Sequence, residues 1–384
     1  MSEIEAEVLV IGGGLHGLGA ALHLARRGRR VVVLERNWVG AHASGASAAG
    51  VRSLWRHPAE IALARESVDL WHRMPGIVGD DCGYVAHGQL RLADAADVGA
   101  LEDRAALAAS LGWDHERLVG HNEVRRLVPG VSPRFVAGLH VEDEGSADPH
   151  RTLRAFRRAA EAAGVVIREG VEVKSVTRSG DRWSLQGDGI RATAPHVVNA
   201  AGAWAGRVAA MFGEEIALST KASMMIVTER VATIEMPVIG MVGGSLSLKQ
   251  TTQGTLLLGG GLQGAYDPDA RRSEVRMTNL ARGARAALDV LPGLSDIVIT
   301  RTWAGVEAAT ADTLPVIGRS EVASGLVHVF GFSGHGFALL PAVAPVVADL
   351  VTGTDSRHDL SAFRPTRLRP AAPAGAAGDA PSSA

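Results

Sequence analysis

A glycine-rich turn near the N-terminus is the first feature of this sequence that could do chemistry. Gly12, Gly14 and Gly17 match the spacing G-x-G-x-x-G, after an apolar segment at 7–11 and at the start of a helical pattern at 15–27. The first glycine permits a tight turn, the second lets a pyrophosphate approach the backbone, and the third lets the helix pack on the strand. Amides at the helix start favour an anion. The pattern therefore predicts a dinucleotide-binding site.

A carboxylate follows this motif at the end of the next predicted strand, at 30–35. Glu35 stands about 20 residues beyond the turn, where an acid can accept hydrogen bonds from ribose hydroxyls and would repel a 2′-phosphate. An incidental acid after a glycine-rich turn is the alternative interpretation. The motif by itself does not distinguish NAD from FAD.

A run of small residues at 40–52 points to a bulky, flat ligand. Small side chains permit close approach of the backbone, and the hydroxyls of Ser44 and Ser47 can reach phosphate oxygens. A flexible linker is the alternative, although linkers seldom lie inside the first third of a compact fold. We expect a ligand contact here.

Composition limits the class of protein. The chain has 384 residues, 46% of them hydrophobic, and its net charge of −2 gives no overall attraction to nucleic acid or to an anionic membrane. A single cysteine, Cys82, excludes an intramolecular disulfide and a cysteine-based zinc cage, so no metal site is expected. The N-terminus is acidic rather than basic, and no apolar stretch is long enough to span a membrane. We expect a cytoplasmic protein.

The order of predicted elements indicates an α/β fold. Strand, helix and strand at 7–35 form a βαβ start, and short strands at 165–199 return the chain to the first sheet. Residues 216–261 are β-rich, a helix is expected at about 273–291, and residues 337–351 read as a buried helix with an irregular start. This order predicts two domains that are interleaved in sequence.

The expected division assigns a Rossmann-type domain to 1–88, 145–215 and 296–368. A smaller α+β substrate domain with an antiparallel sheet takes 89–144 and 216–295. Residues 369–384 are dominated by Pro, Ala, Gly and Ser, so we expect a disordered tail there.

Four separated blocks together give the chain a recognisable resemblance. They are the N-terminal motif with Glu35, the segment 43–52, the segment 197–205 that contains Ala201, Gly202 and Trp204, and a C-terminal pair at 301–318 and 331–341. In these blocks the chain resembles the D-amino-acid oxidase superfamily of FAD-dependent oxidoreductases. That group includes glycine oxidase, sarcosine oxidase and the β-subunits of opine and hydroxyproline dehydrogenases.

The resemblance implies FAD as the cofactor, held by an FAD-binding domain of the Rossmann type. In the family, the loops at 331–341 cover the isoalloxazine, and amides near 334–337 would face its pyrimidine oxygen. Such amides stabilise the negative charge that hydride arrival at N5 pushes toward N1 and O2. The residues expected to contact the cofactor are Gly12, Gly14, Leu15, His16, Gly17, Glu35, Arg36, Ser44, Ser47, Ala48, Ala49, Gly50, Val51, Val173, Ala201, Gly202, Trp204, Gly305, Gly334, His335, Gly336 and Phe337.

The sequence departs from the family pattern at residue 307. Related glycine and D-amino-acid oxidases carry an arginine there that clamps the substrate carboxylate, and this chain has Glu307. A carboxylate would repel a simple amino-acid carboxylate but attract a cationic amine, unless it points outward or pairs with an arginine. The resemblance then shifts toward β-subunits of heteromeric amine dehydrogenases, which pass electrons to a partner subunit.

Four side chains are the candidates for facing the substrate, namely Arg52, Lys249, Glu307 and His335. His335 could instead be chosen for turn geometry, and Lys249 could face solvent. Two further residues, Arg56 and His57, could also reach the flavin or a substrate carboxylate. We expect them instead at the surface, where they would cap a helix predicted from Pro58.

We therefore expect oxidation of the carbon–nitrogen bond of a small amine or amino acid, such as a secondary amine, an opine or a D-amino acid, by hydride transfer to flavin N5. The product would be an imine. An NAD-linked dehydrogenase and a flavin-binding electron-relay subunit stay open as alternatives. The re-oxidant, a histidyl link to the flavin, the oligomeric state and a partner subunit also stay open.

Overall fold

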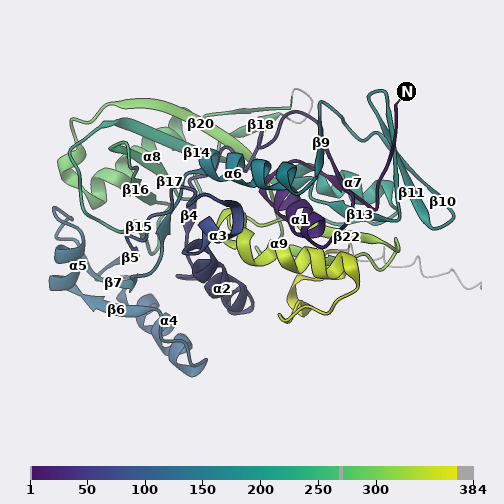
Figure 1. Cartoon of the computed structure of the whole chain (residues 1–384). Helices are drawn as coiled ribbons and strands as arrows, with labels where there is room; N and C mark the ends of the chain where they lie inside the picture. The colour runs from purple at the N-terminus through teal and green to yellow at the C-terminus, as the bar shows by residue number, and fades with distance from the viewer. Residues whose placement is uncertain (1, 268–270, 370–384) are drawn as a thin grey trace, which may run out of the picture.

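Two large sheets lying side by side organise the chain (Figure 1). The computed structural model describes residues 2–267 and 271–369, so all but the first residue of the expected tail lies outside the described residues. The fold is α/β with a Rossmann-type sheet and a second, largely antiparallel sheet, as the sequence predicts.

The first sheet has six strands in the order β21-β22-β13-β2-β3-β9, all parallel except β21. Its strands are β2 (Val8–Ile11), β3 (Val31–Glu35), β9 (Val166–Glu169), β13 (His196–Asn199), β21 (Val316–Arg319) and β22 (Leu326–Phe330). Val8 and Val10 pack into one core with the helices, whereas Leu9 and Ile11 pack into another. Because alternate side chains point to opposite faces, the uninterrupted apolar runs mark strands that are covered on both sides.

Helices cover one face of this sheet, and a small sheet covers the other. The helices on the first face are α1 (Leu15–Arg26), α2 (Ile61–Trp71), α3 (Met74–Val78), α6 (Pro149–Ala162) and α9 (Gly336–Thr352). The opposite face carries α7 (Ala205–Met211) and the four-stranded sheet of β1 (Ser2–Glu5), β12 (Ile190–Ala194), β11 (Arg182–Gly187) and β10 (Ser175–Ser179).

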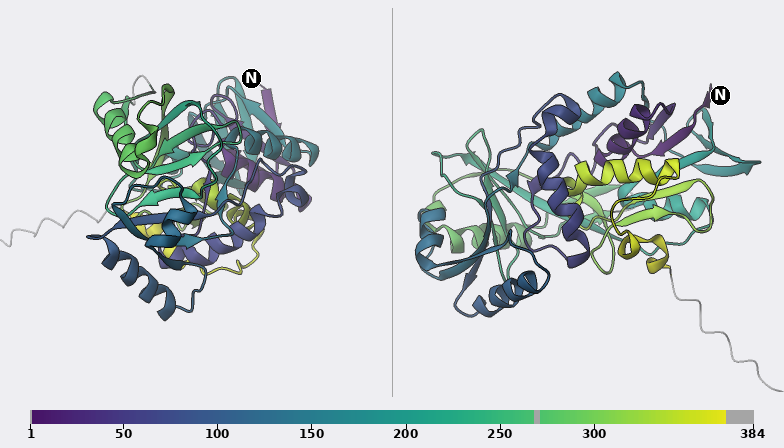
Figure 2. Two further views of the ribbon diagram at one scale, coloured as in Figure 1. Left: turned by 90° about the vertical axis from the view of Figure 1, so that its left-hand side faces the viewer. Right: turned by 60° about the horizontal axis from the view of Figure 1, so that its bottom comes forward.

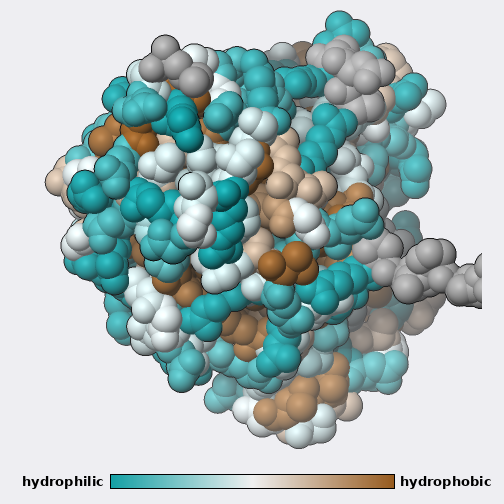
Figure 3. Space-filling model, turned by 90° about the vertical axis from the view of Figure 1, so that its right-hand side faces the viewer, coloured by the Kyte–Doolittle hydropathy of each residue, from teal (hydrophilic) through white to brown (hydrophobic). Residues whose placement is uncertain are grey.

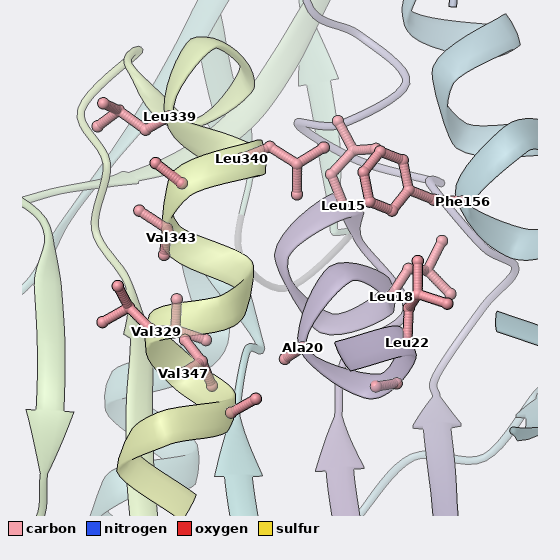
Figure 4. Packing of buried hydrophobic residues seen from close by; sticks show 14 of the residues in the cluster. Leu15, Leu18, Ala20, Leu22, Phe156, Val329, Leu339, Leu340, Val343 and Val347 are labelled. Atoms are coloured by element: carbon pink, nitrogen blue, oxygen red, sulfur yellow. The ribbon is translucent and has the colours of Figure 1, made fainter. Parts of the chain in front are cut away.

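Close packing of α1 fixes the direction in which its N-terminus points. Figure 4 shows Leu15, Leu18 and Leu22 of α1 gathered around Phe156, with Leu340 of α9 reaching toward them. At Gly19 a Cβ atom would lie 2.8 Å from the Cβ of Ala344, so the two helix backbones approach too closely for a side chain.

The long helix α9 is continuous, although it contains two prolines. The sequence predicts an irregular start, but the helix runs without a break through Pro341 and Pro345. Ser67 of α2 binds backbone groups on both sides of Pro341: its hydroxyl donates to the Ala338 carbonyl at 2.6 Å and accepts from the Ala342 amide at 3.4 Å. The helices α1, α2 and α9 lie together in both views of Figure 2.

The second sheet has eight strands in the order β20-β14-β17-β16-β15-β5-β7-β6, antiparallel except for the pair β15 and β5. Its strands are β5 (Gln89–Asp94), β6 (Arg117–Gly120), β7 (Phe135–Val141), β14 (Ser219–Arg230), β15 (Val238–Met241), β16 (Ser247–Gln250), β17 (Thr255–Gly259) and β20 (Ile299–Ala309). Its helices are α4 (Val98–Ser110), α5 (His121–Leu127) and α8 (Met277–Val290). Two short pairs complete the strands: β4 (Gly50–Val51) with β8 (Gly145–Ser146), and β18 (Ala265–Asp267) with β19 (Arg272–Glu274).

Several element boundaries differ from the sequence expectation. Strand β20 belongs to the second sheet, although the expected division places residue 296 onward in the first domain. The expected helix at 273–291 begins only at Met277, because 272–274 pair as β19. A turn of 3₁₀ helix at Pro58–Glu60 precedes α2. The domain division therefore stays a proposal.

The surface shown in Figure 3 carries hydrophobic residues in small groups that are separated by polar ones. Within the described part of the chain, each helix is too short or too polar to cross a lipid bilayer.

Replacing Ser67 by alanine is expected to lower the free energy of unfolding by about 1–3 kcal/mol, because the Ala338 carbonyl and the Ala342 amide each lose a hydrogen bond to the buried hydroxyl. Guanidinium denaturation measures the change. Ser110→Ala is the control, since Ser110 is exposed at the end of α4 and donates only to Leu107. Equal stability of the two variants would contradict this explanation of α9.

Candidate active site

A cavity of about 570 Å³ lies where the two large sheets meet. Its walls come from the glycine turn after β2, the small-residue run at 40–50, the segment after β13, strands β5, β14, β15 and β20, and the loop that leads into α9. These segments are far apart in the sequence. Its volume falls in the range of about 300–1,000 Å³ typical of small-molecule sites.

The glycine turn is built by close contacts between backbones. Gly12 has a φ of +110°, and a Cβ there would lie 2.4 Å from the Ala200 carbonyl oxygen. A Cβ at Gly17 would lie 2.0 Å from the Gly12 carbonyl oxygen. Only glycine satisfies both contacts, because any side chain would push the start of α1 away from the ends of β2 and β13.

The small-residue run closes over this turn. The Leu15 amide donates to the Ser44 hydroxyl at 3.0 Å, and the Gly40 amide donates to the Gly13 carbonyl at 3.1 Å. The Ser47 hydroxyl accepts from the Ala49 amide at 2.9 Å. Each serine hydroxyl still carries a proton that it can donate to an anion in the cavity.

Glu35 is buried beside the turn and is already a hydrogen-bond acceptor. The amides of Gly13 and Asn37 donate to its two carboxylate oxygens at 2.6 and 2.8 Å. These bonds fix the carboxylate at the cavity wall, and each oxygen keeps a lone pair for a further donor.

An aromatic and cationic group forms the next part of the wall. The Arg36 guanidinium lies 4.0 Å from the centre of the Trp204 ring, and His42 packs at 4.5 Å against the same ring. Arg36 also approaches Glu172 at 3.8 Å. Such a cation–π arrangement holds Arg36 with its charge at the edge of the cavity.

Strand β20 brings Gly305 and Glu307 to the wall beside the small-residue run. A Cβ at Gly305 would lie 2.5 Å from the Cβ of Ala46, so the strand lies directly on the small-residue run. The Ser223 hydroxyl donates to the Glu307 carboxylate at 2.5 Å. Burial raises the pKa of Glu307, while the bond from Ser223 and the nearby Lys221 act in the opposite direction. Glu307 faces the cavity and does not point outward.

His335 has a partner that sequence reasoning missed. Its Nδ1 donates to the carboxylate of fully buried Glu60 at 3.0 Å. Burial, together with the neighbouring Arg56, lowers the pKa of His335 to about 4 despite Glu60. His335 is therefore a neutral, oriented group at the start of α9. Glu60 lies in a predicted helix with no motif around it, so no sequence signal could have found it.

His16 connects the glycine turn to α9. Its ring stacks on Phe332 at 3.8 Å, and its Nε2 donates to the Gly336 carbonyl at 2.8 Å. Burial lowers the pKa of His16 to about 4, so the ring is neutral. Its Nδ1 is buried without a hydrogen-bond partner in the part of the chain that the structure describes.

Three arginines line the cavity beside His335. They are Arg52, Arg56 and Arg91. The sequence expectation that Arg56 lies at the surface is wrong: it is 3% exposed, because the turn at 53–57 folds it inward. His57 is exposed, and its ring accepts from the Ala59 amide, as expected for a capping residue. Arg91 lies between Leu90 and Leu92 of β5. Because alternate side chains of a strand point to opposite faces, this alternation is the one sequence signal that could have predicted that Arg91 faces the cavity.

The structure brings together nearly all the residues expected at the site. Gly17 and Val51 lie behind the wall rather than on it, and Lys249 does not line the cavity. The Lys249 side chain is neither substrate-facing nor exposed to solvent: it is 6% exposed and donates to the Ala147 carbonyl at 3.3 Å. The other expected cofactor and substrate residues line the cavity.

Comparison with known proteins assigns this arrangement to a family. A family model described as FAD dependent oxidoreductase matches residues 7–350. One of the subunits of opine oxidase from Rhizobium meliloti is 26% identical over 378 residues, covering 95% of this chain and 98% of that protein. Glycine oxidase of Geobacillus kaustophilus is 27% identical over 374 residues, covering 94% of this chain and 97% of that protein. The structure of L-proline dehydrogenase from P. horikoshii superimposes with a TM-score of 0.88 at 27% identity, covering 95% of this chain and 98% of that structure.

The residues in the cavity fit FAD. The glycine turn lies at a helix N-terminus, which suits phosphates. His16 also lines the cavity, and its buried Nδ1 lacks a partner among the described residues and can bond to a bound group. The family description names FAD, which decides between the two dinucleotides that the glycine motif leaves open and excludes the NAD-linked alternative.

Replacing Gly12 by alanine is expected to reduce the FAD content of the purified protein at least tenfold, because the added Cβ meets the Ala200 backbone. Flavin absorbance per protein measures the content. Gly28→Ala is the matched control, since Gly28 also has a positive φ, +77°, but has open space around it. Full FAD content in Gly12→Ala would contradict the proposed phosphate cradle.

Proposed function

Because the chain belongs to the family of FAD-dependent oxidoreductases, we propose that it oxidises the carbon–nitrogen bond of a small amine or amino acid. One observation carries the proposal: a half-buried carboxylate, Glu307, and a group of arginines line the same cavity as the glycine turn. This pairing of charges suits a substrate with an amine at one end and an anionic group at the other.

Residues at two ends of the cavity would hold the cofactor. The amides at the start of α1, the serine hydroxyls and Glu35 suit the phosphates and the ribose. The loop at 332–337 and Gly305 suit the flat ring, and the N-terminus of α9 presents positive partial charge there. When bound, FAD accepts the hydride that leaves the substrate carbon.

Glu307 is suited to take a proton from the substrate amine. Its raised pKa gives the carboxylate a higher affinity for a proton than an exposed glutamate has. The substrate nitrogen loses a proton to Glu307 and the adjacent carbon loses a hydride, which leaves an imine that water hydrolyses. The arginines and Ser223 keep the substrate and Glu307 oriented while this occurs.

A partner protein is a further part of this proposal. The similar opine oxidase protein is described as a subunit, so we propose that this chain also assembles with an electron-accepting partner. An electron-relay role without its own substrate is the alternative.

Anaerobic addition of amines to the FAD-loaded protein tests the function. We expect at least one class among glycine, sarcosine, D-amino acids, proline derivatives and opines to bleach the flavin absorbance. A flavin that is reduced by dithionite but by no amine in this set would favour the electron-relay role.

In the same experiment, Glu307→Gln is expected to slow flavin reduction about 100-fold at equal FAD content, the size typical for loss of a general base. Glu229→Gln is the control, since Glu229 lies at the exposed end of β14, the strand that pairs with β20. An unchanged rate in Glu307→Gln would contradict the role of Glu307 as the proton acceptor.

A further inference from the structure

The carboxylates around the cavity arginines are each hydrogen-bonded to other groups. The carboxylates nearest to them are committed to other partners: Glu60 binds His335 at 3.0 Å, and Glu116 binds Arg104 at 2.6 Å. Glu144 accepts hydrogen bonds from Ser53 and Leu54. Arg52, Arg56 and Arg91 therefore receive only longer-range attraction from these groups.

The three guanidinium groups lie close enough to affect one another. The Arg56 Nε donates to the Arg52 carbonyl at 3.3 Å. Burial lowers the pKa of Arg56 to about 9 and that of Arg91 to about 10, and the charge of Arg52 contributes to both shifts. A cluster of like charges in a buried wall is unfavourable unless an anion completes it.

Two of these arginines have donors that nothing in the described residues satisfies. The Arg56 Nη1 and the Arg91 Nε are buried and lack a hydrogen-bond partner. Arg56 is 3% exposed, so bulk water does not readily replace the missing acceptor. Both side chains are held in place, Arg91 by the Trp55 ring at 4.5 Å and Arg56 by its bond to Arg52. Fixed guanidinium groups with free donors suit carboxylates.

The positions of these arginines separate the anionic end of a ligand from its amine. Arg52 and Arg56 follow β4, and Arg91 lies on β5, an inner strand of the eight-stranded sheet. Glu307 reaches the cavity from β20, which is an edge strand of the same sheet. One carboxylate bound to Arg56 would leave the buried Arg91 Nε without an acceptor. Two carboxylates would supply acceptors to both unsatisfied donors.

We infer that Arg56 and Arg91, together with Arg52, bind two carboxylate groups of one substrate, so that the substrate is a secondary amine joining two carboxylate-bearing arms, with its nitrogen toward Glu307. This inference rests on the proposed function and narrows its substrate to iminodicarboxylates. Arg56 and Arg91 set specificity, because they contact the substrate away from the carbon that is oxidised.

Binding of substrate-like anions to the FAD-loaded protein tests the inference without turnover. Oxydiacetate has an ether oxygen in place of the amine and two carboxylates, and methoxyacetate is its counterpart with one. Titration followed by the change in flavin absorbance is expected to give a Kd for oxydiacetate at least tenfold lower than for methoxyacetate. Equal affinity for the two anions would overturn the inference.

Variants of the two arginines test whether their side chains cause the selectivity for oxydiacetate. Arg56→Gln and Arg91→Gln are each expected to weaken oxydiacetate binding about 10- to 100-fold, the size of a lost charged hydrogen bond, and to bring its Kd toward that of methoxyacetate. Arg134→Gln is the matched control, since Arg134 pairs with Asp94 on the exposed side of the same sheet. Unchanged selectivity in both glutamine variants would also overturn the inference.

Further controls distinguish a loss of binding from misfolding, and a failure of the inference from a failure of the proposed function. Arg56→Lys and Arg91→Lys keep the charge and are expected to recover part of the affinity, and FAD content reports whether each variant folds. If a glutamine variant does not fold, the lysine variant and the comparison of two anions on the wild-type protein decide. Selective binding of oxydiacetate without reduction by any amine would refute the proposed function alone, whereas reduction by amines without this selectivity would refute the inference alone.

Discussion

The structure depends on the contact between the backbone of Gly12 and the backbone of Ala200. This contact brings the carboxyl ends of β2 and β13 together and lets α1 begin against the Gly12 carbonyl. The site then follows from neighbours of this point: Ser44 binds the first amide of α1, and His16 ties the same turn to α9. A side chain at Gly12 or Gly17 would disturb all of these relations, since each places backbone against backbone.

The second constraint is the separation of charge across the cavity. The Rossmann-type sheet supplies amides and helix termini that suit an anionic cofactor, while the eight-stranded sheet supplies Glu307 at one edge and Arg91 further along. Burial makes these charges effective, because the medium around them screens them less than water does. In the proposed function the two sheets perform different tasks: one would hold the dinucleotide and the other would recognise the substrate.

Much of this could be predicted from the sequence, and the exceptions have physical reasons. The place of the glycine turn between a strand and a helix, the return of the chain at β13 and the family resemblance are confirmed, because each rests on sequence patterns within short segments. The inward position of Arg56, the bond from His335 to Glu60 and the burial of Lys249 away from the cavity depend on contacts between distant segments. Helix α9 contains two prolines and is bound beside Pro341 by Ser67 of α2, a contact between distant segments that local propensity does not reveal.

The central claim is that FAD binds in the cavity between the two sheets, with its phosphates at the start of α1. A crystal structure of the protein with FAD bound tests this claim most directly. We expect the pyrophosphate at the amides that follow Gly12 and Gly14, with the ring between Gly305 and the loop at 332–337. An FAD whose phosphates lie away from the α1 N-terminus, or whose ring lies outside the cavity shared by the two sheets, would contradict this claim.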